Sequence, residues 1–224
     1  MPDRLPTSIV YLCGEETHGV ISLVEKLLEQ KIHRLGGGFK KLFALSDENV
    51  YDIINCFSSD RPLLAYHKLR SRQMCIGKNH SLLLGADGRV YVWGKGTKGE
   101  LGLGSKISFL EKPVPVIIKG DVVNISSGDV HSCAVDSRGG LYSWGQNFDH
   151  QLGLYRKGQP NMPPGCCIER VMLVPKYVPF FYQEFIVQVS CGSRFTAAVT
   201  KVSCPIANQN LCPTLSQDDS NSFF

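Results

Sequence analysis

The chain has 224 residues, of which 43% are hydrophobic and 20% are charged, and its formal net charge is +4. This composition is typical of a folded globular protein and excludes a chain that is disordered throughout. The basic residues are scattered among acidic ones, so the charge does not indicate a lysine-rich arm with general affinity for nucleic acid.

The nine cysteines contain no CxxC pair, the ligand spacing expected of a structural zinc site. We interpret most of them as small buried hydrophobic residues and expect no metal and no cofactor. The odd cysteine count, the lack of an apolar leader and the lack of a long apolar run predict an intracellular protein, cytoplasmic or nuclear, without a membrane span.

The first predicted elements are a strand, a helix and a hairpin. VYLCGEETHGVI, from Val10 to Ile21, begins as an apolar strand followed by a turn. VISLVEKLLEQKI, at residues 20–32, has apolar residues at helical spacing and predicts a short helix. GGFKKLFALSDENVYDI, at residues 37–53, has the strand and turn chemistry of a β-hairpin.

The middle of the chain holds two copies of one stretch. The first, GKNHSLLLGADGRVYVWGKGTKGELGLG, runs from residue 77 to 104, and the second, GDVHSCAVDSRGGLYSWGQNFDHQLGL, runs from 128 to 154. Matched glycine, histidine, tryptophan and leucine residues are each 51 positions apart, which indicates a tandem repeat. The repeat-motif residues are Gly77, His80, Ser81, Trp93, Gly94, Leu101 and Gly102 in the first copy, and Gly128, His131, Ser132, Trp144, Gly145, Leu152 and Gly153 in the second.

Each copy has the local chemistry of strands and tight turns. LLLGADGRVYVW and CAVDSRGGLYSW are apolar runs broken by Asp-Gly or Arg-Gly-Gly, where glycine supplies the positive φ of a hairpin turn. The segment between the copies, PVPVIIKGDVVNISSG, adds two short strands, so one repeat holds about four strands, the size of a propeller blade. Weaker copies flank the two strong ones, at residues 10–21, 37–53 and 191–200.

The combination of GxxHSxxL, a DGxVYxWG hairpin and a following LGL resembles the repeat of the regulator of chromosome condensation family. The resemblance extends from about residue 10 to 200 and implies an all-β fold with antiparallel four-stranded blades, because members of this family are seven-bladed β-propellers. This chain has room for a partial propeller of about four blade equivalents, which indicates a truncated or isoform-like member.

The predicted parts are a half blade at 10–32, blades at 37–75, 77–126 and 128–190, a half blade at 191–200, and a disordered tail at 201–224. The two half blades either combine into one blade that closes a ring or leave the arc open, with strand edges exposed.

The repeat-motif residues are expected to be structural. Trp93 and Trp144 each end an apolar strand and precede a glycine, which favours packing between blades. His80 and His131 recur at equivalent positions, which favours a structural turn histidine over a base or a metal ligand. The GxGxxG at 94–99 lacks the helix that a dinucleotide-binding turn needs. Since no nucleophile lies beside a plausible base, we expect no enzyme activity and no small-molecule substrate.

An enlarged loop distinguishes the second copy. The spacing from Gly128 to Gly192 is 64 positions instead of 51, and the extra length falls in YRKGQPNMPPGCCIER at residues 155–170. This loop either binds a partner or is a tolerated surface insertion. The candidate partner-binding residues in it are Tyr155, Arg156, Lys157 and Arg170.

Three functions are compatible with the sequence. The leading one is a protein-protein interaction scaffold, the role that the family resemblance implies most often. The second is guanine-nucleotide exchange on a small GTPase, which the founding member of the family suggests and which needs no bond chemistry. The third is chromatin or nucleic-acid binding, for which the local support is a basic run of Lys68, Arg70, Arg72 and Lys78.

Overall fold

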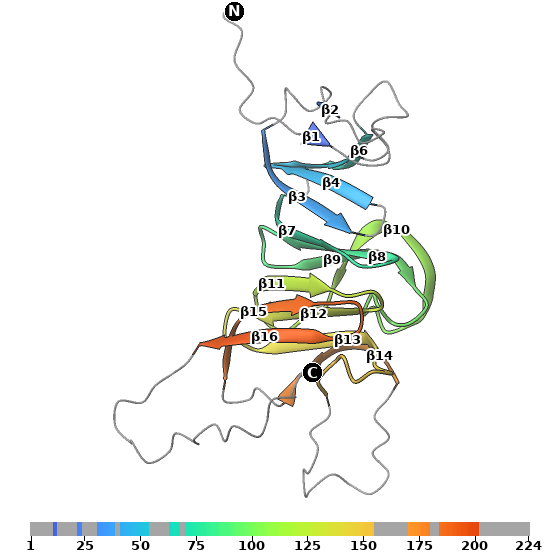
Figure 1. Cartoon of the computed structure of the whole chain (residues 1–224), viewed down its shortest axis with the longest axis vertical. Helices are drawn as coiled ribbons and strands as arrows, with labels where there is room; N and C mark the ends of the chain where they lie inside the picture. The colour runs from blue at the N-terminus through green and yellow to red at the C-terminus, as the bar shows by residue number, and fades with distance from the viewer. Residues whose placement is uncertain are drawn as a thin grey trace, which may run out of the picture.

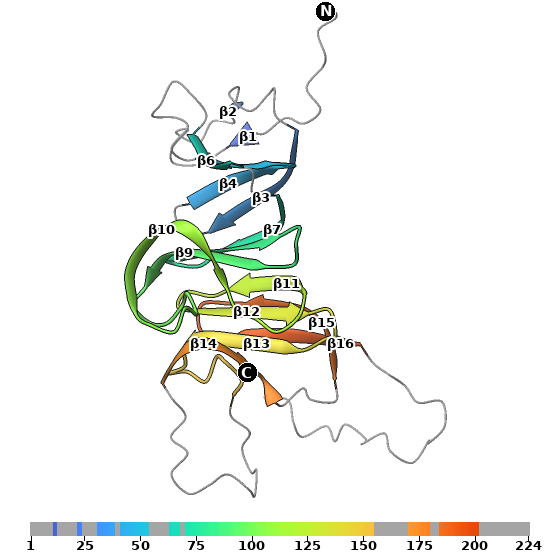
Figure 2. The same cartoon turned by 180° about the vertical axis from the view of Figure 1, so that it is seen from behind.

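The computed structural model describes residues 11–12, 22–23, 31–38, 41–53, 63–67, 70–154, 170–179 and 184–201. The strands in these ranges form antiparallel sheets (Figures 1 and 2). The fold is therefore all-β, as the repeat pattern predicts. Among the described residues, no helix is long and apolar enough to cross a membrane.

Three sheets have four strands each, and in each of them neighbouring strands follow one another along the chain. The first sheet contains β3 (Ile32–Gly38), β4 (Lys41–Ser46), β5 (Asn49–Asp52) and β6 (Leu63–His67). The second contains β7 (Ser71–Ile76), β8 (His80–Gly85), β9 (Val90–Gly96) and β10 (Ile107–Val116). The third contains β11 (Val122–Ser127), β12 (His131–Asp136), β13 (Leu141–Gln146) and β14 (Val171–Tyr177).

Two smaller sheets lie at either end of the described chain. A fourth sheet pairs β15 (Phe185–Cys191) with β16 (Thr196–Lys201), and a short N-terminal sheet pairs β1 (Tyr11–Leu12) with β2 (Ser22–Leu23). The first strands of consecutive sheets contact each other, so β3 lies beside β7, β7 beside β11, and β11 beside β15. Successive sheets that meet along their first strands are arranged as the blades of a β-propeller.

The two tryptophans of the repeat occupy equivalent places between sheets. Trp93 packs edge-on against Phe43 of the first sheet, with ring centroids 6.3 Å apart. Trp144 is fully buried in a cluster with Leu82 of the second sheet and Ile125 of the third. Burying a large apolar side chain contributes about 1.5–3 kcal/mol, so these contacts are a main source of cohesion between sheets.

The strand that begins at each repeat histidine is buried on both faces. Every residue of β8 and of β12 is buried, because each strand has a neighbouring sheet on either side. This explains the continuous apolar runs LLL and CAV, which do not alternate with polar residues as a half-exposed strand would.

The sheets begin one strand earlier than the predicted blades. The predicted blades at 37–75, 77–126 and 128–190 start at or near the repeat glycine, whereas the sheets start with the preceding strands β3, β7 and β11. The pairing of Met74 in β7 with Leu83 in β8 shows why, because the strand before the glycine pairs with the strand after it. A tandem repeat has no intrinsic starting point, so the sequence alone does not assign that strand.

The helix predicted at residues 20–32 is wrong where the structure describes this range. Ser22–Leu23 forms β2 and Ile32 begins β3, so pairing between strands overrides the helical spacing there. Residues 24–30 lie outside the described ranges. The predicted disordered tail also lies outside them, apart from Lys201, which ends β16.

Candidate functional site

The repeated histidine joins one sheet to the next. His80 is buried, and its Nε2 atom lies 2.9 Å from the hydroxyl oxygen of Ser132 in the next sheet. Ser132 donates its own hydroxyl proton to the backbone oxygen of Glu100, at 3.0 Å, so the imidazole Nε2–H donates to Ser132. Burial lowers the pKa of His80 to about 3, which keeps the ring neutral.

The same connection recurs at the following junction. His131 Nε2 lies 3.0 Å from Thr196 Oγ1 of the fourth sheet, and Thr196 donates to the backbone oxygen of Gln151 at 2.7 Å. Glu100 and Gln151 are equivalent positions, and the Glu100 oxygen also accepts a 2.8 Å hydrogen bond from Trp144 Nε1. Both histidines are thus buried connectors, with no exposed face at which a substrate could react.

Glycines allow the close approaches that this connection needs. Gly94 and Gly145 have φ values of 103° and 102°, and a Cβ atom there would come within 2.5 Å of Asn79 O and 2.6 Å of Val130 O. Gly77 is equally constrained, because its Cβ would lie 2.4 Å from the backbone oxygen of Gly128. The remaining repeat-motif residues lie in the same turns or strands: Ser81, Leu101 and Leu152 are buried, Gly102 and Gly153 have positive φ, and a Cβ on Gly102 would meet the Trp144 ring at 2.9 Å.

The turns around the repeat form a surface cavity of about 400 Å³. One side comes from the two residues after the repeat glycine, which place Lys78, Asp129 and Arg194 on three consecutive sheets. The other side comes from the turn after the tryptophan-glycine pair, which contributes Lys98 and Phe148. This cavity, which we call the turn-face cavity, is concave and carries charges of both signs.

The electrostatics of the turn-face cavity are balanced. Arg194 Nε lies 3.9 Å from Asp149 Oδ2, and Ser193 donates to Asp129 Oδ2 at 2.7 Å. Glu100 is buried at the base of the turn, and burial raises the pKa of its carboxyl above the ordinary value. The surface is therefore suited to a partner of mixed charge and polarity more than to a polyanion.

The last residue of the enlarged loop contacts Phe148, which lines the turn-face cavity. The Arg170 guanidinium lies over the Phe148 ring, 5.6 Å from its centroid, and Asn147 N donates to Arg170 O at 2.8 Å. Tyr155, Arg156 and Lys157 lie outside the described residues. Of the four predicted loop residues, the structure describes Arg170, which lies against Phe148, one of the residues that line the cavity.

The predicted basic run does not form one patch. Arg70 precedes β7 and lies 3.7 Å from Glu48, whereas Lys78 follows β7 at the opposite end of that strand and lines the turn-face cavity. Arg72 is in β7 between them, and Lys68 lies outside the described ranges.

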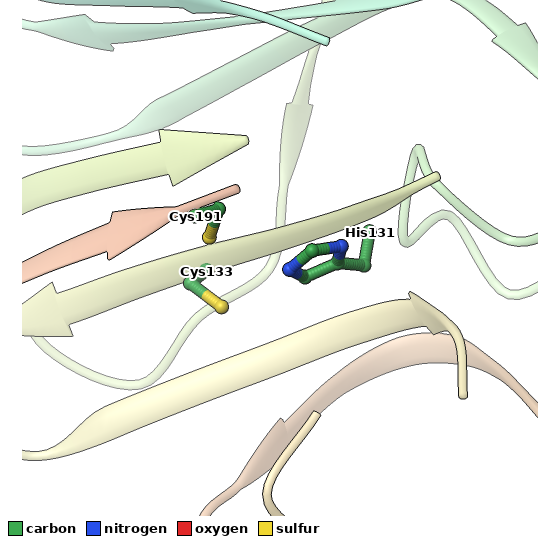
Figure 3. Close-up of side chains that lie close together, drawn as sticks. All are labelled: His131, Cys133 and Cys191. Atoms are coloured by element: carbon green, nitrogen blue, oxygen red, sulfur yellow. The ribbon is translucent and has the colours of Figure 1, made fainter. Parts of the chain in front are cut away.

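A second cluster lies between the third and fourth sheets, where the sequence predicted no metal ligands. A ring nitrogen of His131, Cys133 Sγ and Cys191 Sγ all lie within 4.8 Å of one another (Figure 3). The contact between the two thiols raises the pKa of Cys133 and lowers that of Cys191. A spacing motif could not find this set, because Cys191 comes from a different repeat.

Sequence reasoning also missed most of the turn-face cavity. Lys98, Phe148 and Asp149 occupy turn positions that differ between the copies, GKGTKG in one and GQNFDH in the other. The available signal was positional, since residues next to matched glycines on successive blades must lie on one face of a propeller.

These features define a repeat protein of the β-propeller class, with structural histidines and tryptophans between its blades. The profile of the Regulator of chromosome condensation (RCC1) repeat matches residues 87–135 and 138–199, and a second profile of the same repeat matches 72–100 and 122–151. The chain belongs to this family.

Two human relatives illustrate the relationship. The chain is 34% identical over 131 residues to the probable E3 ubiquitin-protein ligase HERC3 of Homo sapiens, a match that covers 58% of this chain and 11% of the relative. It is 32% identical over 168 residues to the human RCC1 domain-containing protein 1, covering 63% of this chain and 44% of the relative. The chain therefore spans less than half the length of these relatives.

Solved structures share the fold at lower identity. Prp20p from Saccharomyces cerevisiae matches with a TM-score of 0.66 and 18% identity, covering 88% of this chain and 53% of that chain. Human WBSCR16 matches with a TM-score of 0.64 and 21% identity, covering 80% of this chain and 48% of that chain. Both confirm the predicted propeller architecture over part of its length.

Proposed function

We propose that this chain is a protein-interaction scaffold and that the turn-face cavity is its binding surface. The observation that carries the proposal is the contact of Arg170 with Phe148, which brings the end of the enlarged loop to the cavity wall. Phe148 is 53% exposed although aromatic, and both arginine and aromatic side chains, phenylalanine included, are enriched in protein interfaces. Rigid sheets hold these residues in place, which limits the entropy lost on binding.

The proposal is one of binding without catalysis. His80 and His131 are buried and hydrogen-bonded between sheets, which leaves them no route to a substrate. The described cysteines 75, 133 and 191 are free thiols, which supports an intracellular, reducing compartment.

The test is differential capture of partners by matched variants. We would compare the wild-type chain, the double variant F148A/R170A and the control F109A in quantitative affinity purification from cell extract. Phe109 is the matched control because it is 60% exposed but lies on the outer strand β10, away from the cavity. We expect specific partners to be lost with F148A/R170A and kept with F109A. Equal capture of partners by all three proteins would show that the cavity is not the binding surface.

Guanine-nucleotide exchange is a second candidate. It is supported by the fold shared with Prp20p, whose structure was reported together with its binding properties to Gsp1p and histones. Release of a labelled nucleotide from a panel of small GTPases tests it, and unchanged release from every GTPase argues against exchange activity.

Chromatin binding is the third candidate and has the least structural support, because Arg70 and Lys78 lie at opposite ends of one strand. Binding to histones and to duplex DNA at several salt concentrations tests it. Affinity for DNA that falls steeply with salt would favour backbone contacts, and weak, salt-insensitive binding would count against a specific role.

A further inference from the structure

The junction between β12 and β15 brings together one imidazole and two thiols. Cys133 and His131 project from β12, and Cys191 projects toward them from the end of β15 (Figure 3). We propose that His131, Cys133 and Cys191 bind a zinc-like divalent cation, with the Thr196 hydroxyl as the fourth donor.

The distances fit a tetrahedral site. Zinc binds sulfur at about 2.3 Å and nitrogen or oxygen at about 2.0–2.2 Å, so donor atoms at its corners are roughly 3.3–3.8 Å apart. Thr196 Oγ1 lies 3.0 Å from His131 Nε2, 3.8 Å from Cys133 Sγ and 3.9 Å from Cys191 Sγ. The three other donor atoms lie within 4.8 Å of one another, so small side-chain movements complete the coordination.

The charges balance for a divalent ion. Two thiolates and one divalent cation sum to zero, with a neutral imidazole and a neutral hydroxyl as the other donors, and an electroneutral set is the least costly to bury. Binding releases the thiol protons to solvent and moves the imidazole proton from Nε2 to Nδ1. Thr196 keeps donating its hydroxyl proton to Gln151 O while an oxygen lone pair faces the cation.

The preceding junction shows that the fold does not need these thiols. There His80 makes the same connection to Ser132, but Leu82 stands where Cys133 does and Ser127 stands where Cys191 does. The histidine and hydroxyl are therefore explained by the repeat, whereas the two sulfur atoms are an addition at the later junction.

A route for the cation exists on the surface. Cys191 is partly exposed and lines a cavity of about 280 Å³ together with Gly128 and Gly192. His131 and Cys133 are buried, whereas Thr196 is partly exposed, so the site combines access from solvent with a largely enclosed interior.

The experiment uses the full chain, reduced and stripped of metal. Zn²⁺ is titrated in competition with a chromophoric chelator, and Co²⁺ is titrated while its visible absorption reports tetrahedral thiolate coordination. We expect one tightly bound ion, and an affinity lower by about 100-fold or more in C191S and in C133L. Both variants install the residue of the preceding junction, so we expect them to fold.

The matched control is C75S, because Cys75 is a free thiol outside the cluster and is expected to leave binding unchanged. The proposal is overturned if the wild type binds no ion, or if C191S binds as tightly as the wild type, which would assign the ion to other cysteines. A disulfide between Cys133 and Cys191 in place of metal binding under reducing conditions also overturns it. If C133L does not fold, the result with C191S decides.

Discussion

His80 of the second sheet and Ser132 of the third are joined by a buried hydrogen bond of 2.9 Å. Ser132 directly follows His131, which is the counterpart of His80 in the third sheet. The bond continues through Ser132 to the backbone of Glu100, which also holds the Trp144 ring. The repeat motif thus connects one sheet to the next through hydrogen bonds, and the contribution of each residue can be tested separately.

Replacing Ser132 with alanine is expected to destabilise the fold by about 1–3 kcal/mol, because it leaves His80 Nε2 buried without a partner. The control is S81A, since Ser81 is equally buried but its hydroxyl has no hydrogen-bond partner among the described residues. Urea unfolding of both variants measures the difference. Equal losses of stability would show that the hydrogen bond to His80 contributes nothing.

Alanine substitutions at two glycines with positive φ test backbone strain separately from steric crowding of the added Cβ. Gly104 has φ 86°, and a Cβ there would make only an ordinary van der Waals contact, 3.9 Å from Val174 Cγ1, so G104A is expected to cost about 1–2 kcal/mol through backbone strain. At Gly94 the Cβ would lie 2.5 Å from Asn79 O, so G94A is expected to cost roughly 3 kcal/mol or more. Thermal unfolding measures the loss of stability in both variants. A loss in G94A no larger than that in G104A would contradict the prediction that a Cβ at Gly94 is sterically crowded.

The sequence predicts the sheets well because the repeat constrains them locally. The 51-residue offset matches Trp93 with Trp144 and His80 with His131, and the structure places each pair in equivalent surroundings. The position at which each blade begins could not be predicted, since it depends on which neighbouring strand a strand such as β7 pairs with.

The candidate sites depend on contacts between residues that are far apart in the sequence, which no local pattern records. Phe148 meets Arg170 only because β13 and β14 pair side by side. Cys133 meets Cys191 because the fourth sheet stacks on the third, and the stacking distance is a property of the packed side chains between them.

Replacing Glu100 with glutamine is expected to change stability at neutral pH by no more than about 0.5 kcal/mol, or to raise it slightly. Gln151 already fills the equivalent place, where its Oε1 accepts from Asp149 N at 3.0 Å as Glu100 Oε2 accepts from Lys98 N at 2.7 Å. Burial raises the pKa of Glu100, so its ionised form is disfavoured in the folded state. E100A, which removes the acceptor, should cost about 1 kcal/mol more in urea unfolding. Equal losses in E100Q and E100A would show that charge matters at this turn.

The buried His80 predicts a loss of stability in mild acid. Its pKa is about 3 in the folded chain, against 6.5 for an ordinary histidine, so only the unfolded chain takes up this proton between those values. Stability from this group is therefore complete above pH 6.5 and falls toward pH 3, by at most about 1.4 kcal/mol per pH unit.

The H80Q variant isolates this effect, because glutamine can still donate to Ser132 but does not titrate. Urea unfolding at several pH values between about 7 and 4 should give a difference, wild type minus H80Q, that becomes less favourable to the wild type as the pH falls. Other titrating groups are common to both proteins and cancel. Parallel stability curves would mean that the unfolded chain gains no proton at His80 relative to the folded one, and that the ring is reached by solvent in the folded state.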